Sequence, residues 1–332
     1  MDTAQWLAQV SEPIVDPDRP ICDPHHHLWD HPTSRYLLDE LLEDTTSGHN
    51  IVSTVFVECS SMYRADGPAN MAPVGETEFV NGVSAITASG RYGDFRACAG
   101  IVSYANLCLG AAVGEVLDAH MAASSRFRGI RHAAGWDASP DIRNSHTNPP
   151  PHLYLDPTFR QGFAELGKRG LSFDAWLYHP QIAELTDLAR AFPDTTIIFD
   201  HFGGPLGVGP YAGRRDELFP AWQKDVADLA RCKNVVAKLG GIVMPINGFN
   251  WHKRDLPASS DEIVASTGPY HRHTIEVFGA DRCMFESNFP VDRASCSYAV
   301  LWNAFKKMVT DVSSSEKSHL FHDTAARAYR LN

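Results

Sequence analysis

Three consecutive histidines follow the first apolar run of the chain, in the segment Asp23-Pro24-His25-His26-His27. In a β-strand, residues two apart share a face, so Asp23, His25 and His27 are predicted to point into one space and His26 to the opposite side. Two imidazoles about 7 Å apart along one strand can converge on a single metal ion. The alternative is a chance cluster of histidines at a strand end.

Two further histidines close later apolar runs. His179 ends the segment LSFDAWLYH, and His201 ends TIIFDH. A single histidine at a strand end is more often structural than functional, but together with the first pair these residues indicate a metal site. The glycines after His201 lack the spacing of a dinucleotide fingerprint, so no nucleotide is predicted.

Charged residues also occur in otherwise apolar runs. Glu58 ends the second run, Arg131 ends the fourth, and Lys238 lies in the seventh. Buried charges are tolerated when they are paired, so one interpretation is an internal ion network. The other is a substrate site in which Glu58 takes part and Arg131 or Lys238 holds a carboxylate. Glu76, by contrast, is expected to be a solvated charge.

The elements that must position these residues follow a repeating pattern. Apolar runs of strand length alternate with stretches whose apolar residues recur three and four apart, as in amphipathic helices. Eight such units favour an α/β fold of the (β/α)8 TIM-barrel type over an open sheet of five or six strands. The runs lie at 20–25, 51–59, 95–103, 127–132, 171–179, 196–201, 234–241 and 283–290.

No linker, repeat or low-complexity block divides the chain, so a single domain is predicted over residues 20–332, after an N-terminal extension at 1–19. Two connections are long, at 139–157 and 244–270. Both follow the carboxyl ends of predicted strands, where barrel enzymes place their active sites. We expect them to cover a substrate, although idle surface loops would have a similar composition.

Composition restricts the possible partners. The chain has 332 residues, with 29 basic and 40 acidic side chains and a formal charge of −11. This balance argues against nucleic acid as a partner, and no apolar stretch is long enough for a membrane span. Neither a signal nor a transit peptide is evident, so a cytoplasmic location is expected. A small-molecule substrate is the predicted partner. Whether the chain also forms a homo-oligomer stays open.

Three segments resemble one family of enzymes. DPHHHLW, DHFGGP and MFESNFPVD are similar to motifs of the amidohydrolase superfamily, in particular the amidohydrolase-2 branch of lactone hydrolases and, more distantly, zinc-dependent decarboxylases. The resemblance extends from about residue 20 to 330. It implies one divalent metal ion, Zn or Mn, on His25 and His27 and on a histidine of the fifth or sixth strand, His179 or His201. We assign His179 to the metal and His201 to proton transfer.

The end of the eighth run departs from the family pattern. The family usually has an aspartate there, as metal ligand or general base, whereas this chain has Asn288. An amide oxygen can bind a metal or a substrate, but an amide cannot take a proton from water at neutral pH. Glu286 shares the strand face of Asn288, and Asp292 follows the strand end. Either carboxylate is a candidate replacement, although Asp292 could equally cap a helix.

These observations predict a metal-dependent hydrolase of the lactonase type, acting on a cyclic ester of a carboxylated or polyhydroxy small molecule. One alternative keeps the barrel and the metal but makes the reaction a non-oxidative decarboxylation of an aromatic or unsaturated acid. Others are a metal-independent lactonase and a barrel that binds a metabolite without converting it. A fold and a family resemblance do not choose among them.

Overall fold

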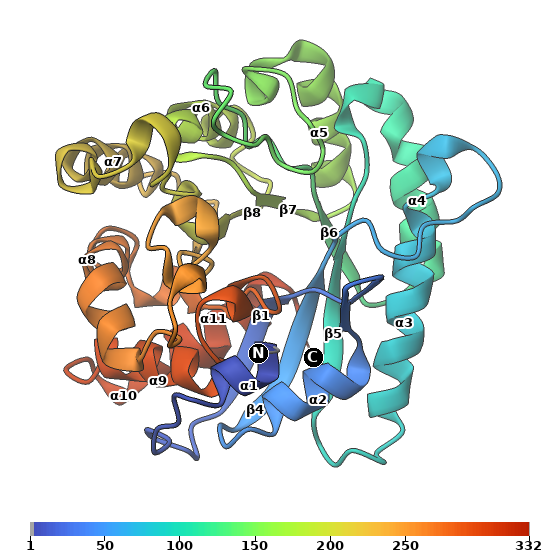
Figure 1. The fold of residues 1–332 in the computed structure, drawn as a ribbon. Helices are drawn as coiled ribbons and strands as arrows, with labels where there is room; N and C mark the ends of the chain where they lie inside the picture. The colour runs from blue at the N-terminus through green and yellow to red at the C-terminus, as the bar shows by residue number, and fades with distance from the viewer. Residues whose placement is uncertain (1–2, 332) are drawn as a thin grey trace.

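The computed structural model describes residues 3–331. Eight parallel strands form one sheet, in which they follow one another in chain order (Figure 1). They are β1 (Ile21–His26), β4 (Ile51–Val57), β5 (Arg96–Ser103), β6 (Phe127–Arg131), β7 (Ser172–Ala175), β8 (Ile197–Phe199), β9 (Val235–Leu239) and β10 (Cys283–Phe285). The sheet closes just beyond β10, where the amides of Asn288 and His27 donate to the carbonyls of His25 and Phe289. The predicted single-domain (β/α)8 barrel is therefore confirmed.

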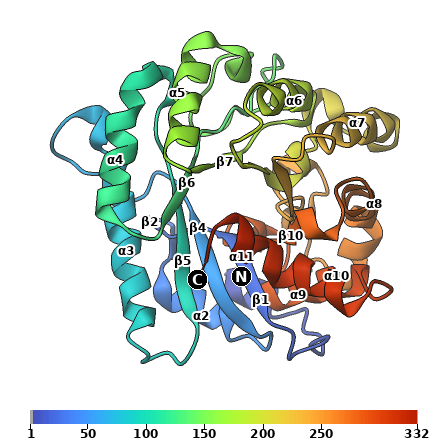
Figure 2. The same cartoon turned by 180° about the vertical axis from the view of Figure 1, so that it is seen from behind.

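A helix follows each barrel strand and packs on the outside of the sheet, so that the helices surround the strands in both views (Figures 1 and 2). These helices are α2 (Leu38–Thr45), α3 (Val74–Ala88), α4 (Val113–Ala123), α5 (Pro157–Lys168), α6 (Ile182–Ala191), α7 (Arg215–Leu229), α8 (Ser260–Phe278) and α9 (Tyr298–Met308). Shorter helices lie near the two ends of the chain, namely α1 (Thr3–Leu7), α10 (Ser314–Ser318) and α11 (Thr324–Ala328).

Apolar side chains form two main cores, one on each face of the sheet, and a third small cluster of Ile142, Tyr178 and Leu206. The larger core lies between strands and helices, and the smaller one fills the inside of the barrel. Residues buried on both faces explain why the strands read as nearly continuous apolar runs. The inner core includes Ala325, Ala328 and Tyr329, so α11 and the residue after it close the base of the barrel.

The strand that carries the three histidines contains one extra residue. Asp23 pairs with Thr54 and His26 with Phe56, so three residues of β1 match two of β4. Such a bulge changes which face the later residues occupy. As predicted, His26 points outward, with its ring against Phe56 and its Nε2 2.9 Å from the Thr54 hydroxyl.

Asp23 also points outward, which corrects the prediction that it faces the barrel mouth. Its Oδ2 accepts a hydrogen bond from the Tyr298 hydroxyl at 2.9 Å, and its Oδ1 accepts one from the Ser287 amide at 2.9 Å. The carboxylate therefore joins β1 to the segment after β10 and to α9. The bulge between Asp23 and His26 is the reason that strand alternation fails for this residue.

Part of one predicted loop is helical. Residues 240–259 connect β9 to α8, which begins at Ser260, so the second part of the predicted loop at 244–270 is helical. The Ser259 side chain accepts from the Glu262 amide and the Glu262 side chain accepts from the Ser259 amide, which is a capping box that starts the helix. A small hairpin was not predicted from the sequence. In it, β2 (Trp29–His31) pairs with β3 (Ser34–Tyr36) at the barrel mouth.

No helix within residues 3–331 is both long and apolar enough to cross a lipid bilayer. The expected cytoplasmic location and the domain boundary at residue 20 stay predictions.

Candidate active site at the barrel mouth

A cavity of about 470 Å³ opens where the strands end. Four of the residues predicted from the sequence line it, namely His27, Arg131, His201 and Asn288. The remaining lining residues come from the hairpin and from the loops after the strands, and are Trp29, His31, Cys59, Arg143, Asn144, Ser145, His146, Trp176, Met244 and Val291.

His25 and His27 converge as the HxH spacing predicted. Their Nε2 atoms lie 3.3 Å apart, and both side chains are buried. The Nδ1 of His27 is 2.8 Å from the carbonyl oxygen of Val57, which can only accept, so this nitrogen carries the proton and Nε2 has a free lone pair. Burial lowers the pKa of both histidines well below the usual range, which keeps the rings neutral.

His201 is held from two sides at the end of β8. Its Nδ1 lies 2.6 Å from Glu286 Oε1, and the Trp176 ring meets the imidazole edge-on at 4.9 Å. Its backbone is left-handed, with φ at +55°. Gly241 packs directly against the ring, because a Cβ at that position would lie 2.0 Å from Nδ1. Burial lowers the pKa of His201, so the ring is neutral and Nε2 is available to the cavity.

Lys238 lies beneath these histidines, completely buried. Its Nζ is 2.7 Å from Asp174, 3.2 Å from Asp200 and 3.0 Å from Nδ1 of His25. The ammonium does not line the cavity. These contacts favour the internal ion network, and a role of Lys238 in holding a substrate carboxylate stays an untested prediction.

The C-terminal segment reaches the same network from below. The Tyr329 hydroxyl donates to Asp174 Oδ2 at 2.6 Å, and the Tyr329 ring centroid is 5.4 Å from the Lys238 ammonium. Tyr329 therefore contacts both Asp174 and Lys238 at the floor of the site.

Glu58 contacts two side chains at the mouth, Arg131 and His146. Arg131 donates through Nε to Oε1 at 2.7 Å and through Nη2 to the backbone carbonyl of Glu58 at 2.6 Å. The other carboxylate oxygen lies 3.0 Å from Nε2 of His146. Burial would raise the pKa of Glu58, but the charges of Arg131 and His146 outweigh burial and hold it well below its usual range. Glu58 does not line the cavity, so it acts by orienting Arg131 and His146.

Asn288, where the family resemblance predicts an aspartate, is oriented by Asp292. The Asn288 side-chain amide donates to Asp292 Oδ1 at 2.9 Å. Asp292 is completely buried and outside the cavity lining, and burial raises its pKa well above the usual range. Glu286 is likewise buried, behind His201. Neither Glu286 nor Asp292 lines the cavity. Each instead contacts a residue that does, since Glu286 contacts His201 and Asp292 contacts Asn288.

A divalent metal ion fits one group of side chains. His25, Asp200 and His201 each offer a ligand atom, and these atoms lie within 4.8 Å of one another. Both Asp200 oxygens are buried without a hydrogen bond within the described residues, although Oδ1 forms the 3.2 Å ion pair with Lys238. Imidazole and carboxylate are common ligands of zinc. Burial raises the pKa of Asp200 and Glu286 and so disfavours their ionised forms, which a bound cation would restore. Asp200 was not predicted from the sequence, although it directly precedes His201 at a strand end.

His179 is not part of this group. Its Nδ1 accepts from the Leu206 amide at 3.2 Å, and its ring packs edge-on against Tyr211 at 5.2 Å. These partners belong to the loop after β8, so His179 lies outside the group of His25, Asp200 and His201, and its assignment as a metal ligand stays a prediction. Glu76 differs from expectation, because it is buried and its Oε1 accepts from the amides of Cys59 and Ser61.

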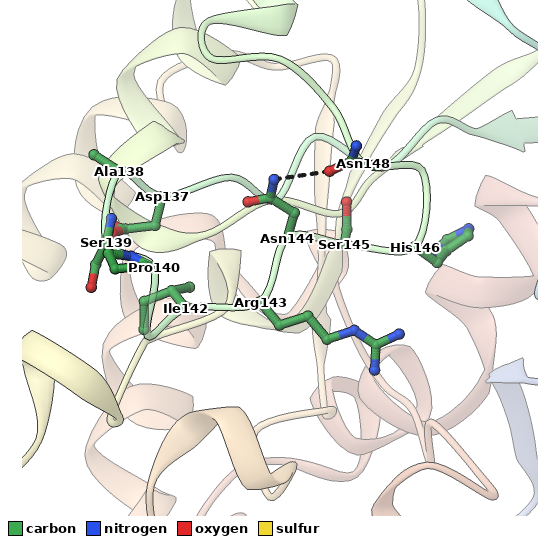
Figure 3. Close-up of a pocket in the computed structure, with 10 residues that line it drawn as sticks. All are labelled: Asp137, Ala138, Ser139, Pro140, Ile142, Arg143, Asn144, Ser145, His146 and Asn148. Atoms are coloured by element: carbon green, nitrogen blue, oxygen red, sulfur yellow. Dashed lines mark hydrogen bonds between the residues drawn. The ribbon is translucent and has the colours of Figure 1, made fainter.

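The loop at 139–157 supplies lining residues that the sequence pass did not single out. Its first part also surrounds a second hollow of about 450 Å³, shown in Figure 3, and the two cavities share Arg143, Asn144, Ser145 and His146. In Figure 3, the side chains of Arg143 and His146 point away from the residues at 137–140. The position of this loop after a strand was the only signal in the sequence.

Comparisons with known proteins agree with this architecture. The chain is 36% identical to the uncharacterized protein y4mH of Sinorhizobium fredii over 336 residues, covering 95% of this chain and 99% of that protein. It is 27% identical to an L-fucono-1,5-lactonase of Burkholderia multivorans over 208 residues, covering 62% of this chain and 64% of the enzyme. The crystal structure of a zinc-bound amidohydrolase from Burkholderia multivorans matches with a TM-score of 0.71 at 20% identity, covering 95% of this chain and all of that one.

Other solved structures with the same fold are described as hydrolases or decarboxylases, at low sequence identity. The model of the amidohydrolase family matches residues 22–331, which is almost the whole barrel. The chain therefore belongs to the amidohydrolase family.

Proposed function

We propose that this amidohydrolase opens the ring of a lactone by adding water, with His201 as the general base. The observation that carries the proposal is the pairing of His201 with Glu286 at the edge of the cavity. A carboxylate on Nδ1 fixes the tautomer, aims Nε2 at the substrate and stabilises the ring when it takes a proton. Among the three potential metal ligands, His201 alone lines the cavity.

The cavity also offers a positive charge for the oxygen that becomes negative during the attack. Arg131 lines the cavity, and two of its guanidinium nitrogens are held by Glu58. The third, Nη1, lies 3.4 Å from Nε2 of His25, at the centre of the site. A cation fixed in advance stabilises developing negative charge at little reorganisation cost. Asn288, whose amide nitrogen is bound to Asp292, presents its oxygen as a further polar group for orientation.

A divalent ion would be held by His25 and Asp200, with Nε2 of His27 3.3 Å from that of His25. When bound, such an ion supplies Lewis-acid polarisation of a carbonyl group and makes water more acidic. We assign to His201 the acceptance of the proton that water loses, because a carboxylate partner such as Glu286 stabilises an imidazole that becomes positively charged. We propose zinc as this ion, because imidazole and carboxylate groups are common zinc ligands and because a structural relative was solved with bound zinc.

The test combines a lactone panel, measured by proton release, with His201→Ala. A general base contributes about 10²–10⁴ in rate, so we expect kcat to fall by that factor while the metal content stays unchanged. His152→Ala is a matched control, because His152 also makes a 2.8 Å contact to a glutamate, Glu184, but is largely exposed at the surface. Loss of the metal in His201→Ala would make His201 a ligand, and unchanged kcat would refute its role.

Isotope labelling separates hydrolysis from decarboxylation. Turnover in ¹⁸O-labelled water should place the label in the product carboxylate and release no CO₂, because hydrolysis consumes water. Stoichiometric CO₂ from the true substrate would overturn the proposal in favour of a decarboxylase on the same barrel. Activity that survives complete removal of metal would instead identify a metal-independent lactonase.

A further inference from the structure

Glu76 is a buried carboxyl group that the proposed reaction does not use. It lies in the first turn of α3, and its Oε1 accepts hydrogen bonds from the amides of Cys59 at 3.0 Å and Ser61 at 2.8 Å. Its other oxygen, Oε2, is buried and has no hydrogen-bond partner among the described residues. Because an unpaired buried oxygen costs stability, the contribution of this carboxyl group comes from the two bonds that Oε1 makes.

The peptide group between Glu58 and Cys59 connects Glu76 to the cavity. Its N–H donates to Glu76, and its carbonyl oxygen accepts from Nη2 of Arg131 at 2.6 Å. A peptide group is planar, so the direction of its N–H fixes the direction of its carbonyl. Glu76 and Arg131 therefore hold opposite sides of one rigid unit, and hydrogen bonds in such a chain polarise and strengthen one another.

The loop after β4 has a backbone that needs this anchor. Ser60 and Met62 are both left-handed, with φ of +61° and +52°, a conformation that is unfavourable for residues other than glycine. Glu76 accepts from the amides on both sides of Ser60. The first turn of α3 also packs directly on the loop, because a Cβ added at Gly75 would lie 2.6 Å from the carbonyl oxygen of Met62. Without the carboxyl group, the loop would relax.

We infer that Glu76 is a positioning residue for Arg131 and acts through the peptide group between Glu58 and Cys59. The inference rests on the proposed function for the task of Arg131, which is to stabilise the oxygen that becomes negative. The Glu58 side chain binds Nε of Arg131 and the Glu58 carbonyl binds Nη2, so Nη1 is left for that oxygen. If the carbonyl turns, the guanidinium turns with it, and Nη1 leaves the position in which it was fixed in advance.

The test compares Glu76→Met with Glu76→Gln on the substrate that the lactone panel identifies. Both replacements keep the length of the side chain, but only glutamine keeps an oxygen that accepts from the two amides. Burial and the charge of Glu58 raise the pKa of Glu76 to about 8, so a neutral glutamine also matches its charge at neutral pH. Glu76→Met should lower kcat by at least about tenfold and change KM by less than about twofold, since the interaction is made in the transition state. Glu76→Gln should stay within about threefold of the wild type, because the acceptor is retained.

A double-variant cycle distinguishes positioning from general damage to the fold. Arg131→Lys keeps a positive charge beside Glu58 but has one nitrogen in place of three, so it cannot span the carboxylate, the carbonyl and the cavity. In that background, Glu76→Met should lower kcat by less than about a further twofold, because the group that it positions is already absent. An equal loss in both backgrounds would mean that Glu76 does not act on Arg131, and would overturn the inference.

Glu12→Met is the matched control. Glu12 also accepts from a backbone amide, that of Ser260 at 2.8 Å, but it lies outside the cavity lining. This variant should lower the free energy of unfolding in urea and leave kcat unchanged. A loss of kcat equal to that of Glu76→Met would refute the inference, because any buried acceptor would then have the same effect.

Amide hydrogen exchange provides a measurement that needs no substrate. The amides of Cys59 and Ser61 should exchange at least about tenfold faster in Glu76→Met than in Glu76→Gln. The Glu58 amide donates to the Val102 carbonyl inside the sheet and should exchange equally in both variants. Equally faster exchange of all three amides would indicate general unfolding and would contradict the inference.

The remaining outcomes separate this inference from the proposed function. It is overturned if Glu76→Met keeps kcat within about twofold of the wild type, or if Glu76→Gln is as damaging as Glu76→Met. Should Glu76→Met fail to fold, Gly75→Ala displaces the same loop, and its loss of kcat should likewise vanish in Arg131→Lys. Release of CO₂ from the true substrate would refute the proposed function alone, since the same cycle on that substrate still reports the position of Arg131. Opening of a lactone with additive losses in the cycle would refute this inference alone.

Discussion

Replacing Gly241 with alanine should displace His201 without removing any group that takes part in the reaction. Gly241 follows β9 with φ at +63°, and an added Cβ would lie 2.0 Å from Nδ1 of His201. Ordinary contacts of a Cβ begin at 3.4 Å, so the ring must move by about 1.4 Å, which is 3.4 minus 2.0. A shift of that size breaks the 2.6 Å contact with Glu286 and takes Nε2 out of alignment.

The expected loss in kcat follows from this displacement. A misplacement of about 1 Å costs roughly 10² in rate, so Gly241→Ala should lose at least about 10²-fold. The left-handed backbone adds about 1–2 kcal/mol of strain, which lowers stability but does not touch the chemistry. Stability and rate must therefore be measured separately, by urea unfolding and by kcat on the substrate that the lactone panel identifies.

Gly170→Ala separates the two effects. Gly170 has the same φ of +63°, but an added Cβ there meets nothing within 4 Å. The two variants should lose similar backbone stability, and Gly170→Ala should keep the wild-type kcat. If Gly241→Ala stays within twofold of Gly170→Ala in kcat, the position of His201 does not control the reaction and the reasoning fails.

Three further predictions concern the metal site, the hydrogen bond between Tyr329 and Asp174, and the buried side chain of Lys306. The double variant of His25 and His27 to alanine should lose bound metal and keep its circular dichroism, and full metal occupancy would contradict the assignment. Tyr329→Phe keeps the ring but loses the hydrogen bond to Asp174, and should lower the free energy of unfolding in urea by about 1 kcal/mol, whereas no change would make that bond neutral. Burial lowers the pKa of Lys306 from 10.5 to about 8, so the unfolded chain binds more protons between these values and stability should rise with pH there. Lys306→Met should abolish this part of the rise in urea titrations at pH 8 and pH 10, and an unchanged slope would argue against the shift.

The barrel itself could be predicted because its strands are buried on both faces. All eight apolar runs form barrel strands, and the alternation of runs with amphipathic segments identifies the class of fold. His27 and His201 could be placed at the mouth because each follows the end of a predicted strand, and the carboxyl ends of parallel strands meet there. These predictions depend only on local pattern and on one general rule of barrel construction.

Tertiary structure decides the features that a local pattern leaves open. The bulge in β1 turns Asp23 outward, and nothing in the local sequence marks the extra residue. Lys238 and His179 both sit in or after strands, but only packing shows that one lies under the site and the other beside it. Arg143 belongs to a loop without regular structure, where the direction of a side chain does not follow from spacing.

The contact between Tyr329 and Asp174 has a consequence for when the site becomes complete. His25 and Tyr329 lie about 300 residues apart in the sequence, and a chain grows at about 5–20 residues per second. The histidines therefore leave the ribosome about 15–60 s before the residue that supports the floor beneath them. The hydrogen bond from Tyr329 to Asp174 therefore forms late in synthesis, long after the histidines of β1 have been made.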